Sequence, residues 1–212
     1  MSRPIPHPSR RALMLAASAL FLLPRAARAA AAASDQDDIG RVQAYLNALK
    51  TMVSRFDQVA GDGSAAAGTI YLDRPGHMRI QYDQPNPILI VATGGRVFYY
   101  DGTLDQVSFV DLDDTPAWFL LQPDLKLSGD ITVQGVQRAP GSLRLTVNET
   151  KHAARGRVTM AFSDHPLQLR QWSIVDAQNK VVTVTLNDPH FGVGVDPRLF
   201  LWTDPRGARG GG

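Results

Sequence analysis

The sequence predicts a mainly β protein in which an antiparallel meander of ten or eleven short strands curls around an apolar interior, covered by two helices. Runs of about five residues alternate apolar and polar side chains, which is typical of strands with one buried face. Gly, Asp, Asn or Pro separates these runs, as expected for tight turns between antiparallel neighbours. Apolar residues recur at helical spacing in only two segments, one before the first six predicted strands and one after them.

The first 29 residues have the features of a cleaved secretory signal peptide. Ser9-Arg10-Arg11 precedes an apolar run from Ala12 to Leu23, and cleavage after Ala29 fits the small-residue rule. Twelve apolar residues are too few to span a bilayer stably. Both the general secretory route and, because of the paired arginines, the twin-arginine route to the periplasm remain open.

Removal of this segment reverses the sign of the net charge. Five of the 22 lysines and arginines lie within it, so 17 basic side chains remain against 20 acidic ones. No basic patch with interleaved aromatic residues is left, which argues against a nucleic-acid partner. The chain has no cysteine, so neither a disulfide nor the lipid anchor of a bacterial lipoprotein is expected. We expect one domain over residues 30–204, stabilised by its core, and a disordered tail over 205–212.

The first helix is predicted from Ser34 to Met52. Acidic residues near its start suit the positive end of the helix dipole. Its apolar residues recur at spacings of three and four and form one face, which we expect to pack on the sheet: Ile39, Val42, Leu46, Leu49 and Val53.

The strands follow, and the clearest pair is a hairpin around the turn Arg74-Pro75-Gly76-His77, because Pro presets φ and Gly accepts positive φ. Apolar residues alternate on both sides of this turn, namely Ile70, Leu72, Met78, Ile80 and Tyr82. Further strands are expected over 56–58, 88–92, 97–100, 106–110, 130–137, 142–147, 157–162, 167–175 and 181–186, and Leu199, Phe200 and Trp202 close the domain as apolar anchors.

Arg74 is the first candidate functional residue. If the strand continues regularly into the turn, its side chain points to the same face as Ile70 and Leu72. A cation at the rim of an apolar face is unusual. The alternative is an ordinary turn arginine in solvent.

The second helix is predicted from Asp114 to Gln122. Asp114 or Thr115 can cap it, and Pro116 suits the first helical position. Its apolar side is large for so short a helix, with Trp118, Phe119, Leu120 and Leu121. Two interpretations remain open, a core plug and a movable lid.

No motif for catalysis or metal binding was found. The histidines fall at turns or strand ends without the spacing of a zinc pair, no serine has a nucleophile elbow, and the carboxylate pairs lie at helix starts, where capping explains them. We therefore expect no enzyme activity, no cofactor and no metal. The surplus of apolar surface instead predicts either a tightly packed core or an apolar cavity for fatty ligands, for which each buried methylene is worth about 0.8 kcal/mol.

An ordered set of short motifs resembles the LolA family of periplasmic outer-membrane lipoprotein carriers. The resemblance runs over nearly the whole mature chain and rests on Phe56-Asp-Gln58, Gly68-Thr-Ile-Tyr-Leu72 with Arg74-Pro75, Gln84-Pro85, Tyr99-Tyr-Asp101, Gln106, Thr115-Pro116 with Leu120-Leu121, Leu169-Arg-Gln-Trp172, Asp176 and Leu199-Phe200.

The resemblance implies an incomplete, unclosed antiparallel β-barrel with helices covering an apolar cavity. It implies that Arg74, beside Pro75, holds a helical lid by hydrogen bonds. The lid would carry Trp118, Phe119 and Leu121, and it would cover a lipid-binding cavity lined by Ile70, Leu72, Met78, Ile80 and Tyr82.

The resemblance also implies a monomeric periplasmic chaperone without a cofactor. It would take acylated lipoproteins from an inner-membrane ATP-driven release complex and deliver them to an outer-membrane lipoprotein receptor. Two other hypotheses remain: a lipid or hopanoid shuttle or lipid-sensing domain of the same fold, and a secreted hydrolase, which would need a polar, convergent pocket.

Overall fold

The computed structural model describes residues 23–115 and 118–207, with side chains from Ser34 onward except that of Phe119. Residues 1–38 and 39–212 form two units, and each is considered by itself. Most of the expected signal peptide (residues 1–22) and the last five residues of the expected tail lie outside the described residues. Cleavage and tail disorder therefore stay predictions.

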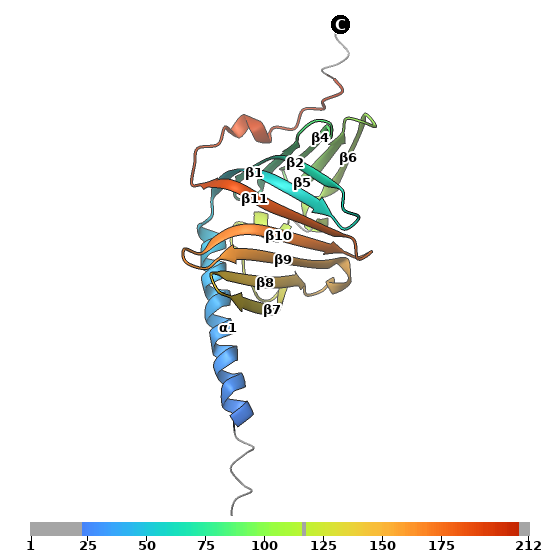
Figure 1. The fold of residues 1–212 in the computed structure, drawn as a ribbon. Coiled ribbons are helices and arrows are strands. Elements are labelled where there is room, and N and C mark those ends of the chain that lie inside the picture. The colour runs from blue at the N-terminus through green and yellow to red at the C-terminus, as the bar shows by residue number, and fades with distance from the viewer. Residues whose placement is uncertain (1–22, 116–117, 208–212) are drawn as a thin grey trace, which may run out of the picture. The chain divides into compact units, whose positions relative to one another are not determined.

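Eleven strands form one antiparallel sheet in the order β6-β5-β4-β3-β2-β1-β11-β10-β9-β8-β7 (Figure 1). The end strands β6 and β7 are not neighbours in this order, so the barrel is unclosed, and the predicted fold class is confirmed. The strands are β1 (Thr51–Ala60), β2 (Ala65–Asp73), β3 (His77–Tyr82), β4 (Ile88–Thr93), β5 (Arg96–Asp101), β6 (Gln106–Asp111), β7 (Ile131–Ala139), β8 (Ser142–Glu149), β9 (Gly156–Ser163), β10 (Gln168–Asp176) and β11 (Val181–Phe191).

The predicted central hairpin is present as β2 and β3. Leu72 pairs with Met78 and Ile70 with Ile80, so the apolar residues of both strands lie on the same face. The turn over residues 74–76 uses Gly76 at φ +81°, a conformation that glycine adopts without a steric penalty.

The first helix differs from its predicted bounds. The helix α1 (Leu23–Ala48) begins eleven residues before Ser34 and ends at Ala48, so Met52 is not helical. Met52 lies in β1, where it pairs with Leu72 on one side and Phe191 on the other. The β-branched Thr51 and Val53 favour a strand, and pairing on both sides overrides the continued helical spacing of the apolar residues.

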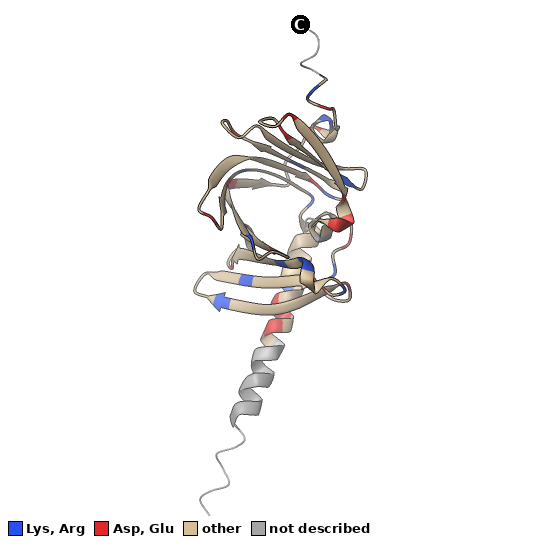
Figure 2. Cartoon of the chain, turned by 90° about the vertical axis from the view of Figure 1, so that its right-hand side faces the viewer, with Lys and Arg blue, Asp and Glu red and all other residues tan. Residues whose placement is uncertain are grey.

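The buried core fills the concave side of the sheet. Figure 2 shows the strands at the two ends of the sheet curving toward the same side. Val42 and Leu46 in the last turns of α1, and Leu49 just after it, join the inward-facing residues of both halves of the sheet in one cluster. Tyr45 packs edge-on against Phe162, with ring centroids 5.8 Å apart.

The C-terminal segment covers the opposite, convex face of strands β3 to β5. Its short helix η3 (Pro197–Phe200) buries Phe200, and Trp202 stacks on Phe98 with a centroid distance of 4.8 Å. Arg79 of β3 donates to the carbonyl of Leu199 at 3.2 Å. The predicted anchoring of the C-terminal segment is confirmed. No helix in the described part of the chain is long and apolar enough to cross a membrane.

Candidate functional site

The segment between β6 and β7 carries two short helical turns in place of the single predicted helix. We call the described residues 112–115 and 118–121 together the α2 segment. It comprises the 3-10 turn η1 (Leu112–Asp114) and the four-residue helix α2 (Trp118–Leu121). Leu121 is 1% exposed, and Trp118 is half-buried against the core. Phe119 lies in α2, but its side chain is outside the described residues.

Arg74 is buried on the apolar side of the sheet, with 6% of its surface exposed. Its guanidinium donates to the carbonyls of Leu46 and, at 3.1 Å, Leu49, and also to the carbonyl of Gln122 at 2.8 Å. The Leu46 carbonyl lies in the last turn of α1, where helix carbonyls lack intrahelical partners and the dipole is negative, and the Leu49 carbonyl lies just after the helix. Arg74 therefore joins the end of α1 to the residue that follows α2. The alternative of a solvated turn arginine is excluded.

Burial lowers the pKa of Arg74, because removal from water disfavours the charged form. An arginine nevertheless stays protonated, so its hydrogen bonds to carbonyls keep their charge-assisted strength. The neighbouring Pro75 is exposed, whereas the Gly76 amide donates to the carbonyl of Leu121 at 2.9 Å. The turn over 74–76 thus binds two successive carbonyls at the end of the α2 segment.

Helix α1 holds the loop that follows α2. The Asn47 side chain accepts from the Leu125 amide at 2.8 Å and donates to the Leu125 carbonyl at 2.9 Å. One turn earlier, the Gln43 side chain accepts from the Leu127 amide at 2.8 Å. Sequence reasoning missed both residues. The sequence did offer a signal, because Gln43 and Asn47 are four residues apart and directly follow the apolar Val42 and Leu46 of the buried helix face.

The residues predicted to line a lipid cavity lie mainly in the packed core. Ile70, Leu72 and Met78 are buried, while Ile80 and Tyr82 are partly buried against the same cluster. The Tyr82 hydroxyl donates to the Gln58 side chain at 2.8 Å, and burial raises the pKa of Tyr82. In this closed arrangement these five residues contact protein, so their role as lipid contacts stays a prediction for a state in which the α2 segment has moved.

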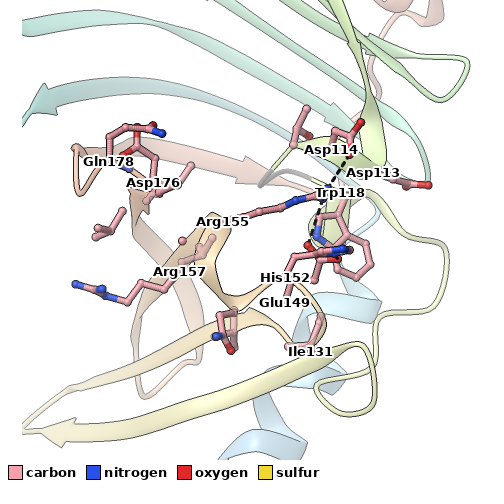
Figure 3. Close-up of a pocket in the computed structure, with 18 residues that line it drawn as sticks. Asp113, Asp114, Trp118, Ile131, Glu149, His152, Arg155, Arg157, Asp176 and Gln178 are labelled. Carbon is pink, nitrogen blue, oxygen red and sulfur yellow. Dashed lines mark hydrogen bonds and ion pairs between the residues drawn. The ribbon is translucent and has the colours of Figure 1, made fainter.

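A pocket of about 430 Å³ lies elsewhere on the same face, at the ends of strands β8 to β10 (Figure 3). The strand register brings its apolar floor together, because Val147 pairs with Val158 and Val158 with Ile174. Trp118 contributes from the α2 segment. None of the five predicted cavity residues lines this pocket. The alternation of apolar and polar residues along a strand shows its buried face, but it does not show which strands will have their ends side by side. Its ionisable lining residues are Asp113, Asp114, Glu149, His152, Arg155, Arg157 and Asp176.

Arg155 connects two walls of this pocket. Its guanidinium lies 3.2 Å from the Asp114 carboxylate in η1 and 3.6 Å from the Glu149 carboxylate at the end of β8. Figure 3 shows this side chain extending between the two carboxylates. His152 also contacts Glu149. Sequence analysis predicted Asp114 as a helix cap and did not identify Arg155 as a candidate residue.

The described residues include no group of three or more His, Asp or Glu placed to hold a metal ion. The described site combines an apolar floor with a covering segment that carries apolar side chains, is hydrogen-bonded at its C-terminal end and forms an ion pair near its N-terminal end. Such an arrangement can bind apolar groups without covalent chemistry.

Comparison with known proteins gives consistent matches. The family model described as outer membrane lipoprotein carrier protein LolA matches residues 47–203. An outer-membrane lipoprotein carrier protein from Methylococcus capsulatus is 27% identical over 199 residues, which cover 89% of this chain and 94% of the relative. One from Legionella pneumophila (strain Lens) is 30% identical over 176 residues, covering 78% and 85%. Among solved structures, a domain of the outer membrane lipoprotein-sorting type from Vibrio parahaemolyticus matches with a TM-score of 0.49 and 11% identity, covering 77% of this chain and 94% of that one.

Proposed function

Because this chain belongs to the LolA family of outer membrane lipoprotein carriers, we propose that it carries lipoproteins through the periplasm by enclosing their acyl chains. The chain would be exported by the general secretory or the twin-arginine route and act as a monomer. It would receive its cargo from an inner-membrane ATP-driven release complex and deliver it to an outer-membrane lipoprotein receptor. No covalent step is required.

The observation that supports this proposal most is the placement of Arg74. Its buried guanidinium lies on the apolar side of an unclosed sheet and binds the carbonyl that follows α2. A covering segment held in this way can be released as a unit by breaking a few hydrogen bonds. The apolar residues beneath it would then exchange contacts with the α2 segment for contacts with acyl chains.

The proposed cycle alternates between the closed arrangement described above and an open, loaded one. Cargo would displace the α2 segment, with its Trp118 and Leu121 side chains, from the apolar residues beneath it, namely Ile70, Leu72, Met78, Ile80 and Tyr82. Re-formation of the Arg74 hydrogen bonds would favour release. Net transfer requires only that the cargo bind the receptor more tightly than the carrier.

Depletion of the protein in its native cell, followed by membrane fractionation, tests the proposal. We expect acylated lipoproteins to accumulate in the inner membrane as the protein is lost, and re-expression of the wild-type chain to restore their sorting. Lipoproteins that remain correctly sorted after full depletion would contradict the proposal. A change in membrane lipids alone would instead favour a lipid or hopanoid shuttle of the same fold.

A further inference from the structure

The two ends of the α2 segment are held by different contacts. At its C-terminal end, the Gly76 amide binds the Leu121 carbonyl, and the buried Arg74 binds that of Gln122. At its N-terminal end, the Leu112 amide donates to the Gly95 carbonyl at 2.9 Å and holds the segment to its own half of the sheet. Toward the opposite half, Asp114 forms an ion pair with Arg155, and the two side chains are 60% and 49% exposed.

This difference predicts which end separates first from its surroundings. Water and salt screen an exposed ion pair, so it contributes little, whereas buried hydrogen bonds to a charged group are stronger. We therefore expect the N-terminal end of the α2 segment to leave the opposite wall while the C-terminal end is still held. The first movement exposes the side of the segment that faces Arg155.

The pocket lies at that weaker end. Asp114 and Trp118 of the α2 segment form one of its walls, and Val147 and Val158 form its floor. These two valines also belong to the buried core cluster, and Trp118 packs against it. An apolar chain that enters the pocket can therefore advance along the same apolar face into the interior without crossing a polar layer.

We propose that this pocket is the entrance through which acyl chains reach the interior, and that Arg155 gates it by pairing with Asp114. The proposal rests on the proposed function, since it concerns how that cargo is admitted. Glu149 gives Arg155 a second carboxylate at 3.6 Å, so Asp114 can leave without isolating the guanidinium. The remaining ionisable groups at this site are Asp113, His152, Arg157 and Asp176. The whole pocket is lined by four acidic residues and two arginines, which does not favour an anionic ligand head group.

A covalent bridge across the entrance provides a direct test. The chain has no cysteine, so the double variant Asp114→Cys/Arg155→Cys carries the only two thiols, which a short bismaleimide can join. The matched control is the same variant with both thiols capped by N-ethylmaleimide. Binding of cis-parinaric acid, a fluorescent fatty acid, is followed by stopped flow. We expect the bridged protein to take up the probe at least tenfold more slowly than the capped protein.

A charge substitution tests the gate separately from the entrance. Arg155→Gln removes the tie to Asp114, and we expect uptake about two- to fivefold faster than wild type, as befits an exposed pair. Lys151→Gln is the matched control, because Lys151 lies in the same turn but pairs with Asp130 at 3.7 Å. Its uptake rate should equal that of the wild type.

The outcomes separate the two proposals. Equal uptake by the bridged and capped forms would overturn the entrance, and a wild-type rate in Arg155→Gln would overturn the gate, while lipoprotein carriage would still stand. If wild-type and capped protein both failed to bind the fatty acid, the acyl-binding site itself would be refuted, and the proposed function with it.

Discussion

Arg74 shows how one side chain can combine a structural and a functional role. Its three acceptor carbonyls are those of Leu46 in the last turn of α1, Leu49 just after it, and Gln122, so it caps a helix and holds the α2 segment at once. Its Nε has no hydrogen-bond partner among the described residues. A planar guanidinium can donate in two directions from fixed positions, whereas a lysine ammonium presents its donors at one point. This geometry explains why the position suits arginine.

Replacing Arg74 with leucine should favour the open form. The hydrogen bond from Arg74 to the Gln122 carbonyl has a charged donor, and such a bond is worth about 1.5–3 kcal/mol. Its loss should therefore shift the equilibrium toward the open form by roughly tenfold or more. We expect Arg74→Leu to bind cargo but to transfer it at least tenfold more slowly to acceptor membranes, measured with a purified lipoprotein complex.

Arg79→Leu is the matched control for this change. Arg79 is partly buried and, like Arg74, donates to a backbone carbonyl. Its acceptor is the carbonyl of Leu199, on the convex face of the sheet and away from the α2 segment. Its removal should lower stability without slowing transfer. A transfer rate in Arg74→Leu equal to that of the wild type would argue against the proposed hold on the α2 segment.

At the scale of elements, α2 depends on its neighbours for its conformation. A helix of four residues has no stability of its own in water. The loop that follows is bound to α1 through Asn47 and Gln43, so α1 and residues 125–127 form a fixed support. Movement of the α2 segment should therefore pivot before Leu125.

Asn47→Ala should loosen this support. Both hydrogen bonds to Leu125 would be lost, and leaving buried backbone groups unpaired costs about 1–3 kcal/mol. We expect faster amide hydrogen exchange over residues 122–127 and a lower unfolding midpoint.

Asn187→Ala removes an exposed hydrogen bond to Asp57 and serves as the control, with little change expected in either measurement. Unchanged exchange over 122–127 in Asn47→Ala would show that α1 does not determine the pivot.

At the scale of the whole molecule, exposed ion pairs add a dependence of stability on pH in the acidic range. A hydrogen bond from Arg55 is the main cause of the lowered pKa of Asp83, and one from Arg41 has the same effect on Asp164. Both carboxyls ordinarily titrate at 3.8. A lowered pKa in the folded state means that these groups contribute stability above the ordinary value. That contribution is lost as the pH falls through the lowered pKa.

We therefore expect the urea midpoint to stay nearly constant from pH 7 to about pH 5 and to fall below about pH 4. In Asp83→Asn the acidic decline should be shallower, because one titrating group is removed. A steep loss of stability between pH 7 and pH 5 would show that groups other than these aspartates control the transition.

The sequence by itself determined the antiparallel meander, its strand count to within one, and the shared face of Ile70 and Leu72, and it raised Arg74 as a candidate on that face. Alternation and turn chemistry are local properties, so they can be read without knowing the neighbours. Only the tertiary structure decided where α1 ends, which carbonyls Arg74 binds, and that Val147, Val158 and Ile174 form a pocket beside Arg155. These features depend on strand register and on backbone groups distant in sequence, and a one-residue shift in register would have moved each side chain to the other face.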